Sequence, residues 1–334
     1  MLKASKDRYL HRKRDILHPS GLMTFKTPLL VPSLSSIGLK IELEDNKLVS
    51  ELPDMLSKVT QIIEEAMLVS AFDIHHKFVG KEYLRVPEIV FVDSGGYEAA
   101  FYDRLKIEKW ERKMYKDILD KWDQYIPAVF ASFDHDSVGL PIEKQINREI
   151  EFLGKYRAHQ MVEILLKPEK GKLYLDVNPI IANIERLNHF SIIGITEKEI
   201  GRTFLERLKF VATLRVQLDR VGNDAPIHIF GCLEPILMVL YFLAGAEIFD
   251  GLSWLRYAYS DGGTVYNREY GVLNLGIKMN FDALKMQILR NNLNFLIEFS
   301  LKMRRFVDTE NYEEFGVSYM KKIKEIHETI YSEL

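Results

Sequence analysis

Eight short apolar runs, rich in β-branched and aromatic residues, alternate along the chain with segments of helical periodicity. Several of these runs have apolar residues on both faces, as in IVFV of residues 89–92, which is typical of parallel strands that are buried on both sides. Eight successive strand-plus-helix units favour an α/β fold, the (β/α)8 barrel of the TIM type, and a doubly wound open sheet is the alternative. The runs cover residues 29–32, 66–70, 89–93, 128–134, 162–167, 191–195, 227–231 and 246–250.

The 334 residues exceed the length of about 250 that a bare barrel needs. We assign residues 1–280 to the barrel domain, with an acidic and largely helical insertion at about residues 39–64. Residues 281–334 are expected to form a C-terminal helical appendage, joined to the barrel by a small hairpin around Asp261-Gly262-Gly263. The sequence has no long Gly/Ser/Pro linker, so these parts are expected to pack as one body.

Composition narrows the class of protein. Hydrophobic residues make up 47% of the chain and charged residues 28%, which is ordinary for a globular protein and excludes a disordered or fibrous one. A net charge of -3 gives no overall attraction to nucleic acid or membranes. The single cysteine, Cys232, excludes an intramolecular disulfide and points to a reducing, cytoplasmic compartment. The longest apolar run is too short to span a bilayer, so no membrane partner is expected.

Three of the eight runs end in an aspartate, namely Asp93, Asp134 and Asp250. In a (β/α)8 barrel the carboxyl ends of the strands form one rim, where catalytic groups gather. A carboxylate at the edge of an apolar strand can have a raised pKa or an increased nucleophilicity. Each aspartate alone could instead cap a helix, but three that converge on one rim predict an active site.

The first of these aspartates is followed by Ser94-Gly95-Gly96-Tyr97. A glycine pair permits backbone conformations that other residues avoid, and it lets a flat ligand approach the main chain beside the Tyr97 ring. The alternative is a tight βα turn with no ligand. A further glycine, Gly231, also follows an apolar run and could form the floor of the same pocket.

Together these residues resemble the tRNA-guanine transglycosylase superfamily, and the matches occur in the family's order from about Pro28 into the tail. Residues 93–97 are similar to its DSGG-aromatic motif, residues 132–134 to its second acidic site, residues 228–235 to its glycine-rich segment, residues 245–250 to its G-x-x-x-F-D nucleophile strand, and residues 292–295 to its closing helix. The resemblance implies a TIM-type barrel that exchanges a base at a glycosidic bond.

The resemblance also implies a role for each site residue. Asp250 would attack C1′ of a guanosine to form a covalent glycosyl-enzyme, and a 7-deazaguanine would then take the place of guanine. Asp93 would protonate the departing base and deprotonate the incoming one. Asp134 would accept hydrogen bonds from the Watson–Crick edge of the base, and Tyr97 would stack on its face. The rest of the base pocket would be formed by Ser94, Gly95, Gly96, Gly194 and Gly231.

Three departures from the family bear on the substrate. The tail lacks the zinc-binding cysteines and Asn291 occupies the matching histidine position, so neither zinc nor another cofactor is expected. The segment after the nucleophile contains Trp254, Arg256 and Tyr257 in place of the usual P-T-R-N, and we predict that these three side chains contact nucleic acid. Glu98 stands where glutamine is common.

These departures favour the DNA-modifying, DpdA-type branch, which inserts 7-cyano-7-deazaguanine into DNA, over the tRNA enzymes. If the substrate is DNA, a helper ATPase that opens the duplex is a possible partner. The sequence does not determine the oligomeric state. Two alternatives are a non-catalytic nucleic-acid-binding subunit and a glycosidase that acts on a sugar polymer. Basic clusters that could contact phosphates, or simply face solvent, comprise Lys3, Lys6, Arg8, Arg12, Lys13 and Arg14 near the start and Lys302, Arg304, Arg305, Lys321, Lys322 and Lys324 in the tail.

Overall fold

The computed structural model describes residues 10–39, 41–44, 47–102, 109–260, 262–278, 280–316 and 318–332. Eight parallel strands close into a barrel in the spatial order β10-β11-β12-β3-β6-β7-β8-β9. The strands are β3 (Leu29–Leu34), β6 (Ala66–Ser70), β7 (Ile89–Asp93), β8 (Ala128–Ala131), β9 (Met161–Leu166), β10 (Ile192–Thr196), β11 (Ile227–Phe230) and β12 (Ile248–Gly251). The closed barrel predicted from the eight apolar runs is confirmed, and the open-sheet alternative is wrong.

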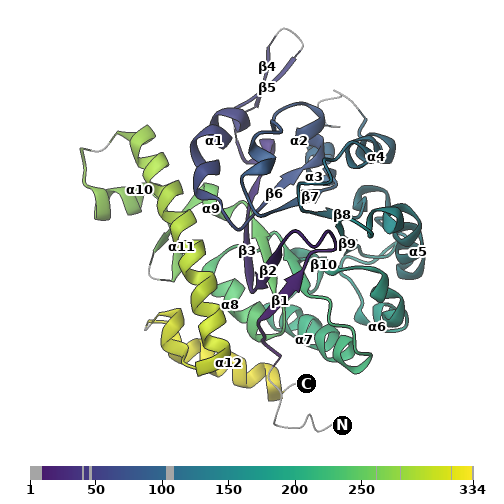
Figure 1. Ribbon diagram of the computed structural model, residues 1–334. Helices are drawn as coiled ribbons and strands as arrows, with labels where there is room; N and C mark the ends of the chain where they lie inside the picture. The colour runs from purple at the N-terminus through teal and green to yellow at the C-terminus, as the bar shows by residue number, and fades with distance from the viewer. Residues whose placement is uncertain are drawn as a thin grey trace.

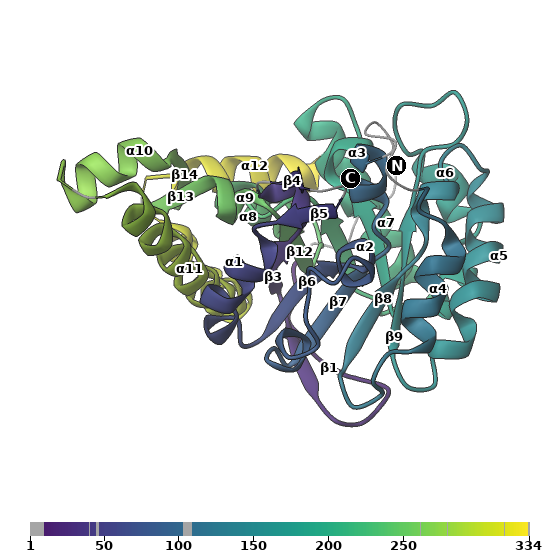
Figure 2. The ribbon, with the colours of Figure 1, turned by 90° about the horizontal axis from the view of Figure 1, so that it is seen from above.

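Helices cover the outside of the barrel (Figures 1 and 2). The longest of them, α7, begins at a capping box in which the Thr203 hydroxyl and the Glu206 carboxylate each accept a backbone N–H of the first turn. Helix α8 has proline at its first position and is followed by Gly245 at φ +104°. The helices are α2 (Ala71–His75), α3 (Gly96–Tyr102), α4 (Arg112–Asp120), α5 (Ile142–Leu153), α6 (Val177–Ile181), α7 (Phe204–Arg220), α8 (Pro235–Leu243) and α9 (Ser253–Arg256).

The barrel interior changes from apolar to polar along the strands. Side chains at alternate strand positions point inward, and the lower levels are filled by residues such as Leu29, Ile89, Met161 and Ile248. Nearer the carboxyl ends of the strands, the inward positions carry polar groups, among them Ser33 and Asp250. Polar side chains are therefore concentrated at the carboxyl-terminal end of the strands, where (β/α)8 barrels carry their active sites.

An antiparallel hairpin of β1 (Arg14–Leu17) and β2 (Thr24–Thr27) closes the opposite, amino-terminal end of the barrel. Phe25 of this hairpin is buried and packs into the barrel interior. Figure 1 looks onto this closed end, with the hairpin in front, and Figure 2 shows the hairpin at the far end of the strands from the α3 side.

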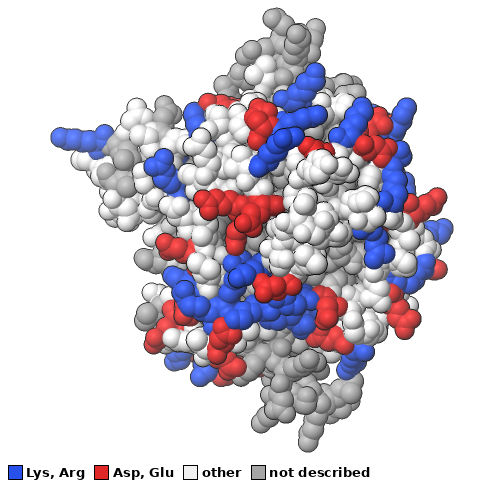
Figure 3. All heavy atoms as spheres, in the orientation of Figure 1, with Lys and Arg blue, Asp and Glu red and all other residues white. Residues whose placement is uncertain are grey.

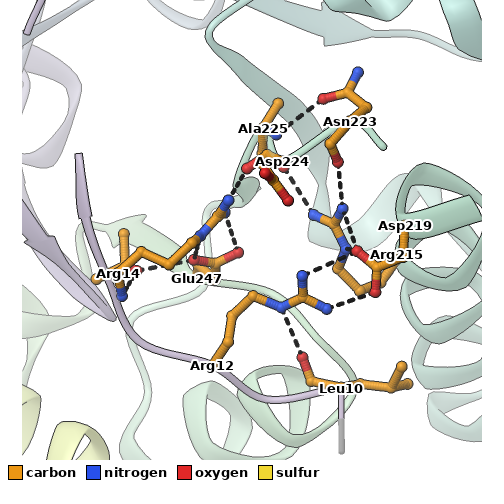
Figure 4. Close-up of polar contacts among 10 residues, drawn as sticks. Leu10, Arg12, Arg14, Arg215, Asp219, Asn223, Asp224, Ala225 and Glu247 are labelled. Carbon is orange, nitrogen blue, oxygen red and sulfur yellow. Dashed lines mark hydrogen bonds and ion pairs between the residues drawn. The ribbon is translucent and has the colours of Figure 1, made fainter. Parts of the chain in front are cut away.

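Two residues of the basic N-terminal cluster, Arg12 and Arg14, connect this hairpin to the barrel through ion pairs. Arg12 makes two hydrogen bonds to Asp219, at 2.9 and 2.7 Å, and the guanidinium of Arg14 lies on the buried carboxylate of Glu247 (Figure 4). Figure 3 shows that basic side chains form a band on this face with acidic side chains among and beside them. Arg12 and Arg14 thus stabilise the closed end of the barrel, and Lys3, Lys6 and Arg8 lie outside the described residues.

The insertion after β3 differs from its prediction. Its first half is an antiparallel hairpin of β4 (Ile41–Glu44) and β5 (Lys47–Ser50), and only then does the helix α1 (Leu52–Val59) follow. The alternation of apolar and acidic residues in Ile41-Glu42-Leu43-Glu44 has the two-residue period of a strand. The prediction that the whole segment is largely helical was wrong, because it relied on the acidic composition and not on this two-residue period.

The C-terminal part begins with the predicted small hairpin, formed by β13 (Tyr257–Ser260) and β14 (Gly263–Tyr266), while Asp261 lies outside the described residues. The short helix α10 (Asn267–Tyr270) follows, and then α11 (Phe281–Thr309) and α12 (Met320–Ser332). Helix α11 buries Leu289, Leu293 and Leu296 in the main core, and Figure 2 shows α10, α11 and β13–β14 extending to one side of the barrel. Within the described ranges, no helix has the length and apolarity to cross a membrane.

Candidate active site

Asp93 is the last residue of β7, and its carboxylate is held by the turn that follows. The Gly95 N–H donates to Asp93 Oδ2 at 3.2 Å. The side chain keeps some exposure, as a group that meets a substrate must, although protein surrounds it on most sides. Burial raises the pKa of Asp93 well above its ordinary value, and the nearby charges of Asp134, Glu98 and Asp250 raise it further. Asp93 is therefore a carboxyl group that keeps its proton to a higher pH than an ordinary aspartate.

The two glycines after Ser94 let the Asp93 turn pack closely against neighbouring side chains, for different reasons. Gly95 has φ +86°, and a Cβ there would lie 2.8 Å from Phe72 Cβ and 3.1 Å from Trp110 Nε1. Gly96 has ordinary backbone angles, but its Cβ would lie 3.2 Å from Asp134 Oδ1. The glycine pair thus lets the Asp93 turn lie against both a packed aromatic cluster and the second acidic group.

Replacing Gly95 with alanine should therefore destabilise the protein by about 2–3 kcal/mol, through the left-handed backbone and the contact with Phe72. Gly21→Ala is the matched control because Gly21 also has a positive φ, +70°, but a Cβ there would meet no atom within 4 Å. We expect it to cost only about 1 kcal/mol. Urea unfolding of both variants measures the difference, and equal losses would contradict the packing argument.

Asp134 follows β8 and lies between a hydroxyl and a cation. Its Oδ1 accepts a hydrogen bond from Ser94 Oγ at 2.5 Å, and Lys167 Nζ lies 3.2 Å from its Oδ2. Lys167 is itself buried and also contacts Glu199 and Thr196. Burial works against the charged form of Lys167, but the two carboxylates outweigh it and the net effect raises the pKa of this lysine. A carboxylate acceptor and an ammonium donor therefore stand side by side.

Asp250 is buried near the end of β12, with both carboxylate oxygens occupied. Oδ2 accepts a hydrogen bond from Ser33 Oγ at 2.6 Å, and Oδ1 accepts one from the Gly231 N–H at 3.0 Å. These two hydrogen bonds fix the orientation of the carboxylate. Gly231 has φ +76°, and a Cβ on it would meet no atom within 4 Å, so the space beside this N–H is open.

The structure brings the three predicted aspartates together. Ser94 joins the Asp93 turn to Asp134 through its hydroxyl, and the charges of both Asp134 and Asp250 act on Asp93. Tyr97, in the first turn of α3, is 56% exposed and thus accessible to a ligand. Gly194 lies deeper, where a Cβ would come within 2.6 Å of the Phe230 ring and 2.9 Å of Glu163 Oε1.

One predicted contact residue is in the wrong place for its role. Trp254 is completely buried and donates its indole N–H to the Ser33 carbonyl at 3.0 Å, so it cannot contact nucleic acid. Its large apolar ring fills space behind Ser33, the residue that holds Asp250. Arg256 is exposed and Tyr257 is half-buried against the Tyr266 ring, so both retain accessible surface.

The sequence interpretation missed a buried pair inside the barrel. The carboxylate of Glu163 on β9 lies 2.8 Å from Nδ1 of His228 on β11, and the other ring nitrogen of His228 faces Asp250. In the sequence, His228 stands out only as the first residue of the glycine-rich segment 228–235. The available signal was a glutamate within an otherwise apolar strand run, where a charge needs a buried partner.

Glu98 and Asp73 form a second buried acidic pair close to Asp93. Glu98 accepts a hydrogen bond from the Ser35 hydroxyl, and Asp73 accepts one from the Ser36 N–H at 2.9 Å. Burial, together with a neighbouring carboxylate in each case, raises the pKa of both groups to about 7. The negative charge of Glu98 therefore contributes to the raised pKa of Asp93.

Asn291, which occupies the position of the family's zinc-binding histidine, has polar contacts within the C-terminal part. The Asn291 amide donates to the Tyr270 hydroxyl at 3.1 Å and accepts from Gln287. Cys232 is buried in the core, where burial raises the pKa of its thiol. In the described ranges no three His, Cys, Asp or Glu side chains are grouped so as to hold a metal ion.

No family model matches the chain. Curated relatives do, and those described here are named tRNA-guanine(15) transglycosylase. The protein from Nanoarchaeum equitans is 21% identical over 254 residues, which are 70% of this chain and 55% of that protein. The Pyrobaculum aerophilum protein is 26% identical over 193 residues, 54% of this chain and 37% of that one. The Methanocaldococcus jannaschii protein is 20% identical over 285 residues, 79% of this chain and 40% of that one.

This chain is similar to the tRNA-guanine transglycosylase superfamily. The similarity agrees with the resemblance carried by the motifs around Asp93, Asp134 and Asp250. The chain spans about half the length, or less, of these curated relatives. Their names match the tRNA alternative better than the DNA-modifying branch that the sequence interpretation favoured.

Proposed function

We propose that this protein exchanges guanine for a guanine-like base in nucleic acid through a covalent glycosyl-aspartate at Asp250. The observation that carries the proposal is the contrast between two neighbouring carboxyl groups. Each carboxylate oxygen of Asp250 accepts a hydrogen bond that holds it in place, while burial and nearby carboxylates raise the pKa of Asp93. An ionised nucleophile beside a protonated acid is the pair that a double displacement at a glycosidic carbon requires.

In the first half of the reaction, an oxygen of Asp250 forms a bond to C1′ as the bond from C1′ to guanine N9 breaks. The electron pair of that bond stays on guanine, and Asp93 supplies the proton that neutralises the departing base. In the second half, Asp93 accepts the N9 proton of the incoming base. The N9 atom then attacks C1′ and releases Asp250 as a carboxylate.

Recognition of the base is assigned to the groups around Asp134. Its carboxylate would accept hydrogen bonds from the N–H groups on the edge of a guanine, and the adjacent Lys167 ammonium is placed to donate to a carbonyl oxygen on that edge. The edge of a guanine presents N–H groups beside a carbonyl oxygen, whereas an adenine has no carbonyl oxygen. Tyr97 would cover one face of the base, and Gly96 would let the backbone lie close to Asp134, the group that binds the base edge.

For the polymer we propose tRNA, because the similar proteins are named as tRNA enzymes. DNA is the second candidate, supported by the altered segment that contains Arg256 and Tyr257. The test incubates the protein and radiolabelled guanine with tRNA, duplex DNA or single-stranded DNA, with Asp250→Asn as the inactive control. We expect label in tRNA. Label in DNA alone would reassign the substrate, and no incorporation into any polymer would support a non-catalytic binding subunit.

Replacing Tyr97 with alanine should weaken binding of the free base about 5- to 150-fold, because stacking contributes about 1–3 kcal/mol per base. Binding of the nucleic acid should change less than about threefold, since phosphate contacts dominate that affinity. Calorimetric titration with guanine and with the polymer measures both. Tyr125→Ala is the control, because Tyr125 is 74% exposed and lies before β8, at the other end of the barrel. Equal losses for both ligands would contradict the stacking role.

A further inference from the structure

Three buried ionisable side chains form a line across the barrel interior. His228 is fully buried, Glu163 is 1% exposed and Asp250 is 5% exposed. Nδ1 of His228 lies 2.8 Å from Glu163 Oε1. Nε2 lies 3.3 Å from Asp250 Oδ1, although the ring is not aligned for a good hydrogen bond there. The histidine therefore connects a deeply buried glutamate to the proposed nucleophile.

The neighbouring strands create the space for this line. Glu163, His228 and Asp250 lie on β9, β11 and β12, and β10 stands between the first two. At that level β10 carries Gly194, which is paired in register with His228. Any side chain on Gly194 would come within 2.9 Å of Glu163 Oε1. The glycine therefore allows a carboxylate and an imidazole from non-adjacent strands to meet.

The positions of the two carboxylates favour a positively charged ring. A neutral imidazole has one N–H donor and one lone pair, so one of its nitrogens would present a lone pair to a carboxylate oxygen. Only the imidazolium presents an N–H toward both Glu163 and Asp250. The other described groups against the ring are the apolar rings of Phe91 and Phe230, at 5.7 and 4.0 Å between centroids, and they supply no competing charge.

The energetics agree with the geometry. Burial lowers the pKa of His228, but Glu163 and then Asp250 outweigh this effect and the net result raises it to about 9. Burial also raises the pKa of Glu163, and the contact with the imidazolium opposes that rise. The net effect still raises the pKa of Glu163 above its ordinary value, and at pH 7.5 the histidine is expected to be an imidazolium.

We propose that Glu163 holds His228 as an imidazolium and that this cation stabilises the departing carboxylate of Asp250, which makes it a better leaving group. The proposal rests on the glycosyl-aspartate chemistry described above. Asp250 must attack C1′ in one half of the reaction and leave it in the other. The adjacent cation stabilises the carboxylate relative to the neutral ester, so it favours release of Asp250 when the incoming base attacks. Glu163 and His228 are positioning residues, since neither reaches the substrate.

The first test measures the charge on the ring directly. In protein labelled with ¹⁵N-histidine, NMR reports whether both ring nitrogens carry a proton, and His228→Gln identifies the signal. We expect the wild-type ring to be doubly protonated at pH 7.5 and to lose a proton only near pH 9. In Glu163→Gln the ring should be neutral at pH 7.5. A neutral ring in the wild type, or an unchanged ring in Glu163→Gln, would overturn the proposal.

The second test measures release of Asp250. The glycosyl-enzyme is formed in excess, separated from free base, and mixed rapidly with guanine, and its decay is followed. In His228→Gln we expect decay to be about 10- to 100-fold slower than in the wild type. A role confined to folding would lower the amount of adduct but leave its decay rate unchanged, and that result would contradict the proposal.

A matched control variant and the result for the wild type distinguish failure of the proposal about His228 from failure of the proposed function. His18 is also buried, at the closed end of the barrel, where its ring contacts Ser20 and the Ala128 carbonyl. His18→Gln should leave the decay rate unchanged. If the wild type forms no adduct, the proposed function fails while the NMR result still decides the charge on His228. If the adduct forms beside a neutral His228, only the further inference fails.

Discussion

Base exchange should fall by about four orders of magnitude or more when Asp250 is replaced by asparagine, because the covalent step loses its nucleophile. Asparagine has nearly the same shape; its amide oxygen can accept from the Gly231 N–H while its NH2 group donates to the Ser33 hydroxyl oxygen, so the fold should be retained. Incorporation of labelled guanine measures the loss, and a thermal melt confirms that the variant is folded. Residual activity within about tenfold of the wild type would contradict the assignment of the nucleophile.

Asp219→Asn is the matched control for this substitution. Asp219 is also a paired aspartate, held by Arg12 and Arg215, but it lies at the closed end of the barrel (Figure 4). Its replacement should lower the melting temperature through loss of these ion pairs and leave the exchange rate per folded molecule unchanged. A large loss of exchange in this variant would mean that the assay responds to stability rather than to chemistry.

The second large effect is expected at Asp93. Asparagine at this position cannot donate or accept the proton, so exchange should fall by about 10²- to 10⁴-fold. A substrate in which the target guanine carries a methyl group on N7 separates chemistry from structure, because its cationic base departs without needing a proton. We expect Asp93→Asn to form the glycosyl-enzyme from this substrate at nearly the wild-type rate. Failure to do so would show that Asp93 is needed for more than proton transfer.

The same assignment gives a pH dependence with a definite sign. The raised pKa of Asp93 means that its acid form is present below that pKa and is lost as the pH rises through it. Formation of the glycosyl-enzyme in the wild type should therefore slow as the pH increases. Asp93→Asn with the N7-methylated substrate should lack this decrease.

The barrel and the three aspartates could be predicted because their signals are local in the sequence. A strand buried on both faces appears as a short apolar run, and an aspartate at its end marks the rim, so residues 89–93 and 246–250 already indicate both strand and site. The chain order of these runs then determines which ends meet, since successive parallel strands align their carboxyl ends.

The contacts between distant residues could not be predicted in this way. Glu163 and His228 are 65 residues apart, and their pairing depends on the barrel register and on the space left by Gly194. Lys167 ended an apolar run and carried no motif that would link it to Asp134. The rim position expected for Trp254 was wrong because burial of an aromatic ring after a strand depends on packing that sequence spacing does not reveal.

The most direct test of the central claim is to identify the residue that carries the sugar. The protein is incubated with the nucleic acid alone, denatured before an incoming base can release the intermediate, and digested for mass spectrometry. We predict a nucleotide attached to the peptide that contains Asp250, absent in Asp250→Asn. Attachment to Asp93 or Asp134, or rapid exchange without any attached nucleotide, would contradict the account.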